Sequence, residues 1–378
     1  MIKGLINGLL STVLVLGVFP LISCPSDYAV AAPLVQKTAP TMPNEWQALV
    51  TAAQKEGKVT LYGHIGSEAK KVLLKELKSK FGITAEVVSG RGGEIANKII
   101  AEQNSGLYIA DVIFASTTNI INYLLPQGKV DRMDSVLILP EILDPKVWWE
   151  GKLPWVDKEK RYHLAFFASP RVDVMVNTSM VKPGEIESYK DLLAPKWKGM
   201  IVINDPTITG AGISWFSAAN AMLGTEYMRK LAKQEPRIVQ DQRLQVEWIA
   251  RGKYPILIAA TEQAEAEFVK AGAPIELLDL AEGGNVSQSS GALSLALKAP
   301  HPNAAKVVIN WVLSKEGQTK LAKAYLMQSG RVDVPTDFLP PNTVRKPGRR
   351  YINNSTEEFQ FLKTENLKLA EKIFGHLK

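Results

Sequence analysis

Small polar residues follow three short apolar runs near the beginning of the chain, and their types suit the binding of an anion. The polar groups are Gly66-Ser67, Arg91-Gly92-Gly93 and Ser116-Thr117-Thr118. Each group stands where a helix is expected to begin, and the unpaired N–H groups and positive dipole end of a helix N-terminus favour an anion. Arg91 adds a guanidinium that can hold a carboxylate, phosphonate or phosphate through two hydrogen bonds.

Further candidate ligand-binding residues are scattered along the chain. Arg171 offers a second guanidinium, and the run Thr209-Gly210-Ala211-Gly212 precedes another predicted helix. His64 follows the first apolar run. Glu262 stands one helical turn before Glu265 and either pairs with a cationic group of a zwitterionic ligand or complements a helix dipole. For each hydroxyl the alternative is an ordinary helix cap, and for each arginine it is a surface salt bridge.

The elements that must position these residues can be predicted from the spacing of apolar side chains. Three β-branched runs, which begin at Val59, Ile83 and Asp111, alternate with two segments whose apolar residues recur at helical spacing. This alternation predicts β-α-β-α-β, and therefore an α/β protein with a mainly parallel sheet flanked by helices. Ligands bind beyond the carboxyl ends of such strands, which is where the polar groups stand.

A second α/β set follows, with strands predicted over Met200–Asn204, Pro255–Ala259 and Ile275–Leu278. A late strand, Leu293–Leu297, is free to return to the first sheet. The order predicts two lobes joined by more than one crossing, with a ligand cleft between them and closure about a hinge. The predicted boundaries are 44–135 with 285–330 for lobe 1, and 136–284 with 331–378 for lobe 2.

The N-terminal segment predicts export from the cytoplasm. Lys3 precedes the apolar stretch Leu5–Ile22, as in a signal peptide. Leu21-Ile22-Ser23-Cys24 resembles a lipobox, in which Cys24 would be lipidated, whereas Ala29-Val30-Ala31 resembles an ordinary signal-peptidase site. Both a lipoprotein and a free periplasmic protein therefore stay open. Residues 1–32 form the processed region, and residues 33–43, rich in Pro, Thr and Ala, form a linker.

The net charge and the sequence motifs limit the classes of function that are expected for the chain. Subtracting 38 acidic from 45 basic residues leaves a net charge of +7, which suits an anionic ligand or an envelope location. Nucleic-acid binding is not expected, since no dense basic stripe is interleaved with aromatic residues. Ser67 and Lys70 match the short S-x-x-K pattern, but G-x-S-x-G, H-E-x-x-H, Walker A and C-x-x-C motifs are absent. We predict no catalysis, no cofactor and no metal site among the four histidines.

Several segments together carry a family resemblance. They are GKVTLYGHIGSEAKKVLLKELKSKFGI, VVSGRGGEIANKIIAEQNSGLYIADVIFAS, LLAPKWKGMIVINDP and GALSLALKAPHPNAAKVVINWVLSKEGQ. They resemble the family 1 extracellular solute-binding proteins of ABC importers, in the subgroup named for ferric iron. The resemblance implies a two-lobed type II periplasmic binding protein, expected to be monomeric, that delivers a small ligand to a permease with its ATPase.

The resemblance also implies a set of Fe(III) ligands in the subgroup, and this sequence departs from it. Such members resemble each other in a residue such as histidine after the first strand, a carboxylate after the third, and adjacent tyrosines in the second lobe. Here His64 stands near the first position, but Ser116 and Thr117 follow the third strand, and no Tyr-Tyr pair occurs. We therefore predict a small anion as ligand, with direct Fe(III) binding, a lipid-tethered sensor and a periplasmic hydrolase as alternatives.

Overall fold

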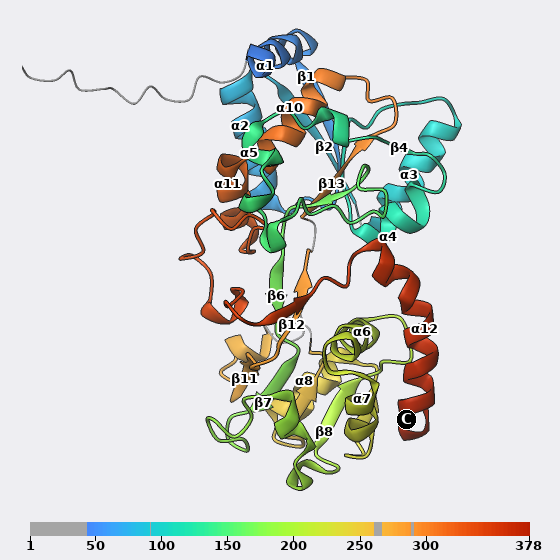
Figure 1. Cartoon of the computed structure of the whole chain (residues 1–378), viewed down its shortest axis with the longest axis vertical. Helices are drawn as coiled ribbons and strands as arrows, with labels where there is room; N and C mark the ends of the chain where they lie inside the picture. The colour runs from blue at the N-terminus through green and yellow to red at the C-terminus, as the bar shows by residue number, and fades with distance from the viewer. Residues whose placement is uncertain (1–43, 91, 261–266, 289–290) are drawn as a thin grey trace, which may run out of the picture. The chain divides into compact units, whose positions relative to one another are not determined.

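Two large β-sheets, each covered by helices, and a small sheet that links them organise the protein (Figure 1). The structure is a computed structural model, and it describes residues 44–378 apart from 91, 261–266 and 289–290. Residues 42–378 form one compact unit, with separate apolar cores around the two large sheets.

The first sheet has the strand order β2-β1-β3-β13-β4, with β5 paired beside β13. Strand β1 is parallel to both β2 and β3, whereas β13 is antiparallel to its neighbours. The prediction that a late strand returns to the first sheet is confirmed by β13. The strands are β1 (Lys58–Gly63), β2 (Thr84–Ser89), β3 (Val112–Phe114), β4 (Val130–Asp131), β5 (Leu164–Ala165) and β13 (Ala292–Ala296).

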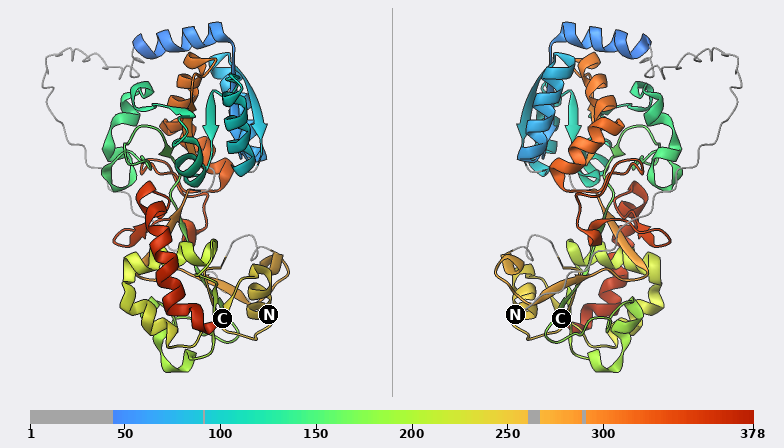
Figure 2. Two further views of the ribbon diagram at one scale, coloured as in Figure 1. Left: turned by 90° about the vertical axis from the view of Figure 1, so that its right-hand side faces the viewer. Right: turned by 90° about the vertical axis from the view of Figure 1, so that its left-hand side faces the viewer.

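Five longer helices pack around the first sheet, and α1 lies across one end of this group in contact with α10 (Figure 2). In α2 the residues Ala69, Leu73, Leu77 and Phe81 are buried because they recur every fourth position along one face. The helix ends at Gly82, which takes the left-handed conformation at φ 70° and donates to the last carbonyls. The five helices are α1 (Asn44–Glu56), α2 (Ser67–Phe81), α3 (Gly92–Asn104), α10 (Pro302–Leu313) and α11 (Lys315–Tyr325).

The second sheet has the strand order β11-β7-β10-β8-β9 and is also mixed. Its strands are β7 (Val174–Asn177), β8 (Ile201–Asn204), β9 (Arg237–Val239), β10 (Ile256–Ile258) and β11 (Ile275–Leu278). The helices packed around it include α6 (Ala211–Leu223), α7 (Thr225–Ala232), α8 (Gln242–Ala250) and α12 (Glu357–Phe374). Ile201 and Ile203 of β8 are fully buried, and Phe216 of α6 packs in the same core.

The small linking sheet consists of β6 (Ser169–Arg171), β12 (Gly283–Ser287) and β14 (Arg350–Ile352). β12 lies in the middle, antiparallel to β6 and parallel to β14. Along the chain, β6 follows β5 of the first sheet and leads into β7 of the second, while β12 leads from β11 back to β13. The chain therefore passes between the two large sheets through adjacent strands.

The segment that follows residue 136 packs with the first sheet rather than the second. Leu139, Ile142 and Trp148 belong to the first core, and β5 pairs with β13. The boundary predicted at residue 136 falls inside this packed region, and the lobe division stays a prediction. Short helices fill the segment, including α5 (Pro140–Leu143).

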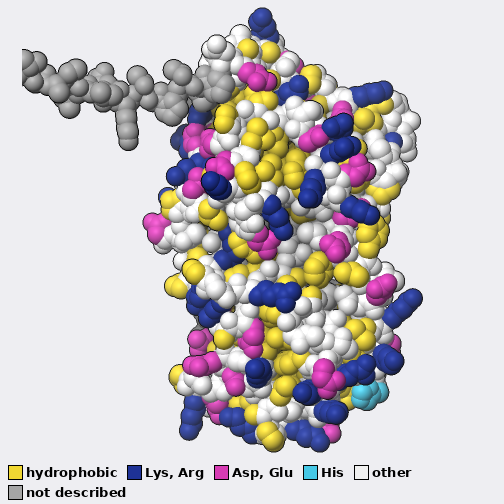
Figure 3. All heavy atoms as spheres, in the orientation of Figure 1, with side chains coloured by type: hydrophobic (Ala, Val, Ile, Leu, Met, Phe, Trp, Pro, Cys, Tyr) yellow, Lys and Arg dark blue, Asp and Glu magenta, His cyan; other side chains and the backbone are white. Residues whose placement is uncertain are grey.

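The surface of the described residues shows no single-sign field on the face drawn in Figure 3, where Lys and Arg side chains alternate with Asp and Glu. Among the helices of residues 44–378 that the structure describes, none combines the length and the apolar character needed to cross a membrane.

Candidate functional site

A polar cavity of about 210 Å³ lies at the carboxyl end of β3, beside the linking sheet. Five parts of the chain contribute to it: the turn after β3, the strand β6, the strand β12 with the residue that follows it, the helix α6, and the start of α12 with the residues before it. Its lining residues are Ser116, Thr117, Thr118, Arg171, Ser214, Asn285, Val286, Gln288, Asn354, Ser355 and Gln360. We call it the polar cavity below.

Ser116 and Thr117 enter the polar cavity because β3 ends at Phe114 and a helix begins directly afterwards. The helix starts as α4 (Thr117–Asn119) and continues with π-type hydrogen bonding over Ile120–Leu124. The Ser116 hydroxyl oxygen accepts a hydrogen bond of 2.9 Å from the Asn119 amide. Thr117 is buried and donates to Gln288 at 2.9 Å. The strand end therefore presents one exposed and one fixed hydroxyl.

Arg171 stands at the end of β6, opposite Asn285 of β12. Its Nε lies 3.2 Å from Oδ1 of the buried Asp173, and its Nη2 donates to the Ala260 carbonyl at 3.0 Å. Asn285 donates to the other Asp173 oxygen at 2.9 Å. A guanidinium has five N–H donors, and these contacts use two of them. With its side chain 25% exposed, Arg171 can offer the remaining donors to the polar cavity.

Ser214 reaches the polar cavity because α6 begins very close to the end of β8. A Cβ atom at Gly212 would come within 2.3 Å of the carbonyl oxygens of Asn204 and Asp205, so only glycine fits there. The Gly212 N–H donates to the Asn204 side chain at 2.9 Å. This close approach fixes the first turn of α6, and with it the place of Ser214.

The C-terminal part of the chain supplies the wall that sequence reasoning missed. Asn354 donates to the Ser214 carbonyl at 3.1 Å, and Thr118 donates to Gln360 at 3.3 Å. Gln288 donates to Asn353 at 3.2 Å. The polar run Asn353-Asn354-Ser355 before a helix was the only local signal, and helix capping explains that run equally well.

The donors of the polar cavity are better suited to an anion than to a cation. Arg171 is the one charged residue among its described lining residues. No hydrogen bond donated by the hydroxyls of Ser116, Ser214 and Ser355 is seen within the described residues, so these groups can turn toward a ligand. A guanidinium with several hydroxyls is a donor set that carboxylates and phosphates accept from.

Among the residues that the structure describes, the other sequence-predicted site residues do not line the polar cavity. His64 is exposed, Gly66 is the N-cap of α2, and Ser67 is its first residue. Gly92 and Gly93 open α3. Thr209 and Gly210 are exposed before Ala211, the first residue of α6. Arg91, Glu262 and the lipidation candidate Cys24 lie outside the described residues. Of the predicted residues, Ser116, Thr117, Thr118 and Arg171 are brought together.

A metal centre finds no support in the described residues. Outside 1–43, 91, 261–266 and 289–290, no group of three His, Cys, Asp or Glu side chains could hold an ion. A hard trivalent cation needs anionic oxygen ligands, and the described lining of the polar cavity contains no carboxylate.

Sequence comparison identifies the class of protein that this fold and cavity belong to. Residues 67–326 match the family model described as bacterial extracellular solute-binding protein, so the chain belongs to that family. It is an extracellular solute-binding protein, a non-catalytic component of a transporter. The absence of catalysis predicted from the sequence is confirmed. No protein with a curated description matches the chain directly.

Solved structures of periplasmic binding proteins share the fold. The iron- and citrate-bound FutA protein of Trichodesmium has a TM-score of 0.61 and 18% identity, covering 84% of this chain and 99% of its own. Ferric iron-binding protein A of Mannheimia haemolytica, in an open conformation, has a TM-score of 0.63 and 14% identity, covering 84% and 98%. AfuA of Actinobacillus pleuropneumoniae, bound to fructose-6-phosphate, has a TM-score of 0.52 and 20% identity, covering 85% and 99%. The predicted fold class, a type II periplasmic binding protein, is confirmed.

Proposed function

We propose that this protein captures a small oxyanion in the polar cavity and delivers it to an ABC permease and its ATPase. The observation that carries the proposal is the Arg171 guanidinium, which lines the cavity with donors left over from its pairing with Asp173. The ligand classes that fit are a carboxylate, a phosphonate or phosphate ester, and a ferric ion held through a partner anion.

The size and charge of the polar cavity support a small ligand of low charge. Drug-sized ligands occupy pockets of about 300 to 1,000 Å³, and the polar cavity is smaller, at about 210 Å³. The charge of Arg171 is partly balanced by Asp173, so hydroxyl and amide hydrogen bonds must supply much of the affinity. A monoanion or dianion that also carries hydroxyl groups matches this set of partners.

Two structural neighbours support the anion class by analogy of fold. One is described with iron and citrate and another with fructose-6-phosphate, and both citrate and the sugar phosphate are oxyanions. Direct Fe(III) binding is the second candidate, because ferric-binding proteins are among the neighbours. For this second candidate Glu262 and Glu265, which lie outside the described residues, would have to supply carboxylate ligands.

The N-terminal signals belong to the same proposal. Residues 1–32 direct export, and the protein works in the periplasm as a monomer, tethered through Cys24 if the lipobox is used. In the alternative function, a lipid-tethered sensor, the same fold and cavity would bind the ligand. The ligand-bound protein would then be received by a partner other than the permease. Mass spectrometry of the mature N-terminus distinguishes a lipidated Cys24 from cleavage after Ala31.

The experiment that tests the function is a thermal-shift panel on the purified protein, followed by calorimetric titration. Its arms are citrate, inorganic phosphate, fructose 6-phosphate, a phosphonate, and Fe(III) with and without citrate. A ligand at 1,000 times its dissociation constant stabilises the folded protein by about 4 kcal/mol, which raises the melting temperature clearly. Stabilisation by an organic anion alone supports the proposal. Stabilisation by Fe(III) alone replaces it with direct metal binding.

A further inference from the structure

The C-terminal segment is firmly attached to the second sheet. β14 pairs with β12, and the last turns of α12 bury Ala370, Ile373 and Phe374 in the second core. The Phe374 ring meets that of Phe216 edge to face, with centroids 6.2 Å apart. Apolar burial on this scale contributes several kcal/mol, so α12 behaves as part of the second-sheet region.

The beginning of the same helix faces the polar cavity. Asn354 and Ser355 precede α12 and Gln360 lies in its first turns, and all three line the cavity. Asn354 donates to the Ser214 carbonyl of α6 at 3.1 Å, and Gln360 is connected to the turn after β3, where Thr118 donates to it at 3.3 Å. That bond is long and partly exposed, so it contributes little to holding the two walls together.

Glu357 makes the stronger connection to the first-sheet region. Its backbone N–H donates to the Val156 carbonyl at 2.8 Å, and its Oε2 accepts from the Lys158 N–H at 2.5 Å. Val156 is buried against Ala165 of β5 and Ala292 of β13. The two hydrogen bonds therefore join the start of α12 to residues 156–158, which pack on the first sheet through Val156. A charged acceptor makes the Lys158 bond the stronger of the pair.

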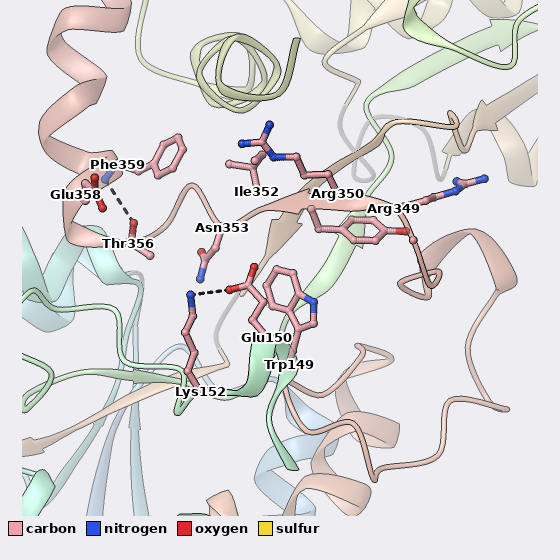
Figure 4. A pocket seen from close by; sticks show the side chains of 12 residues that line it. Trp149, Glu150, Lys152, Arg349, Arg350, Ile352, Asn353, Thr356, Glu358 and Phe359 are labelled. Atoms are coloured by element: carbon pink, nitrogen blue, oxygen red, sulfur yellow. Dashed lines mark hydrogen bonds and ion pairs between the residues drawn. The ribbon is translucent and has the colours of Figure 1, made fainter. Parts of the chain in front are cut away.

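On the neighbouring side of the segment, Trp149 packs against Ala168, Val286 and Tyr351 of β14. Beside that contact, a groove of about 660 Å³ lies between the side chains of Glu150 and Lys152 and the start of α12 (Figure 4). In the figure the Glu150–Lys152 ion pair, 2.7 Å long, and Trp149 form one wall of the groove, while Phe359 and Ile352 form the other. The position of the C-terminal wall relative to Thr117 and Thr118 thus depends on few polar contacts.

We infer that Glu357 is a positioning residue for solute binding, which holds Asn354, Ser355 and Gln360 at the distance from the β3 turn that the ligand requires. The inference rests on the proposed function of the polar cavity. A wall held in place before the ligand arrives loses less conformational freedom on binding, which raises affinity without any direct contact between Glu357 and the ligand.

Glu358 offers a matched control. It stands in the same first turn of α12, it is exposed, and it lines the groove rather than the polar cavity. Both carboxylates complement the positive end of the helix dipole to a similar degree. Glu357→Ala and Glu358→Ala therefore remove the same charge from the same turn, and only the first removes the acceptor of the Lys158 N–H.

The test titrates wild type, E357A, E357Q and E358A with citrate, inorganic phosphate and fructose 6-phosphate. We expect E357A to weaken binding about three- to ten-fold, as the loss of one or two pre-ordered side chains would. E357Q keeps an acceptor and should rescue affinity to within about two-fold, and E358A should match wild type. Equal affinity of E357A and wild type, or failure of E357Q to rescue, overturns the inference.

Amide hydrogen exchange tests the positioning role of Glu357 independently of the proposed function in solute binding. In E357A the amide of Lys158 and those of residues 354–360 should exchange faster than in wild type, whether or not a probe binds. Unchanged exchange overturns the positioning role even if E357A has a lower melting temperature. Binding of none of the probes by wild type overturns the proposed function, and the inference then fails with it.

Discussion

The same hexapeptide pattern, Ser-x-Arg-Val-Asp-Val, occurs at residues 169–174 and 329–334, and the two copies hold their arginines very differently. The copies begin side by side, since Phe167 pairs with Ser329 and the Gln328 N–H donates to Ser169. Arg331 is enclosed with its side chain 1% exposed, whereas Arg171 is 25% exposed at the polar cavity. The shared pattern, with Pro170 in one copy and Gly330 in the other, thus contains one buried arginine and one that is partly exposed at the polar cavity.

The difference lies in what surrounds each guanidinium. Arg331 meets both Asp333 oxygens at 2.9 Å, donates to the carbonyls of Glu141 and Leu313, and packs over the Trp148 ring. Contacts within the protein therefore occupy the N–H donors of the Arg331 guanidinium. Arg171 has one carboxylate contact, to Asp173, and one carbonyl contact. Arg171 is a candidate binding residue because the fold leaves some of its donors unused, and the shared hexapeptide pattern does not determine this property.

The largest expected effect is on stability at the enclosed copy. Arg331→Ala leaves Asp333 without its bidentate partner and opens a void beside Trp148, so we expect a loss of about 3 to 5 kcal/mol in the free energy of unfolding. Urea denaturation followed by tryptophan fluorescence measures it. Affinity for a panel ligand, measured on the folded fraction, should stay unchanged. A loss of unfolding free energy below about 1 kcal/mol would mean that Arg331 stabilises the fold no more than a surface ion pair does. The structural difference between Arg331 and Arg171 would then have no energetic counterpart.

The second effect is on affinity at the open copy. Arg171→Ala should weaken binding of the best panel anion by about 1.5 to 3 kcal/mol, the range for a hydrogen bond to a charged group. Calorimetric titration measures it. Because the variant also removes the guanidinium beside the buried Asp173 carboxylate, the double variant R171A/D173N serves as the control for charge burial. Full affinity in both variants would remove Arg171 from the site.

The third effect concerns the pH dependence of stability at the enclosed copy. Burial raises the pKa of the Asp333 carboxyl, but the hydrogen bond and charge of Arg331, with Lys315, outweigh burial and bring its pKa below the ordinary 3.8. The resulting stability is complete above pH 3.8 and is lost as pH falls through the lower pKa of the folded state. Asp333→Asn should cost roughly 1.5 kcal/mol at pH 7. Denaturation at pH 7, 5 and 3 should show this difference shrinking only below about pH 4.

The smallest effect is expected at a fully solvated arginine. Arg251 pairs with Glu247 one turn earlier on α8, at 2.9 Å and with 77% of its side chain exposed. Arg251→Ala should change stability by about 0.3 to 0.5 kcal/mol, and that change should fade in high salt. Thermal unfolding at low and high salt provides the measurement. If Arg251→Ala cost nearly as much stability as Arg331→Ala, burial of the arginine side chain would not explain the large effect expected at Arg331.

Much of the fold was predictable because strong local patterns agreed with the tertiary structure. The alternating strands and helices from β1 to β3 carried clear apolar periodicity. β12 and β14 were not predicted, since Gly283-Gly284-Asn285 and Arg350 have weak intrinsic preference for strands. Those segments are strands because neighbouring strands complete their hydrogen bonds.

The candidate site was predictable only in part, for a related reason. Ser116 and Thr117 follow a strand end, which places them without knowledge of the rest of the fold. Asn354, Ser355 and Gln360 come from more than 200 residues further along the chain. No local pattern indicates that they approach the β3 turn, because that proximity follows from the packing of α12 against α6 and from the linking sheet.

The position of Phe374 in the second core has a consequence for the order of events in the cell. Strands of that core begin at Val174, and the last turn of α12 closes it 200 residues later. Contacts over such a span form slowly, because a long loop must be ordered before they contribute. The second core therefore cannot be completed until α12 has been synthesised and has left the ribosome.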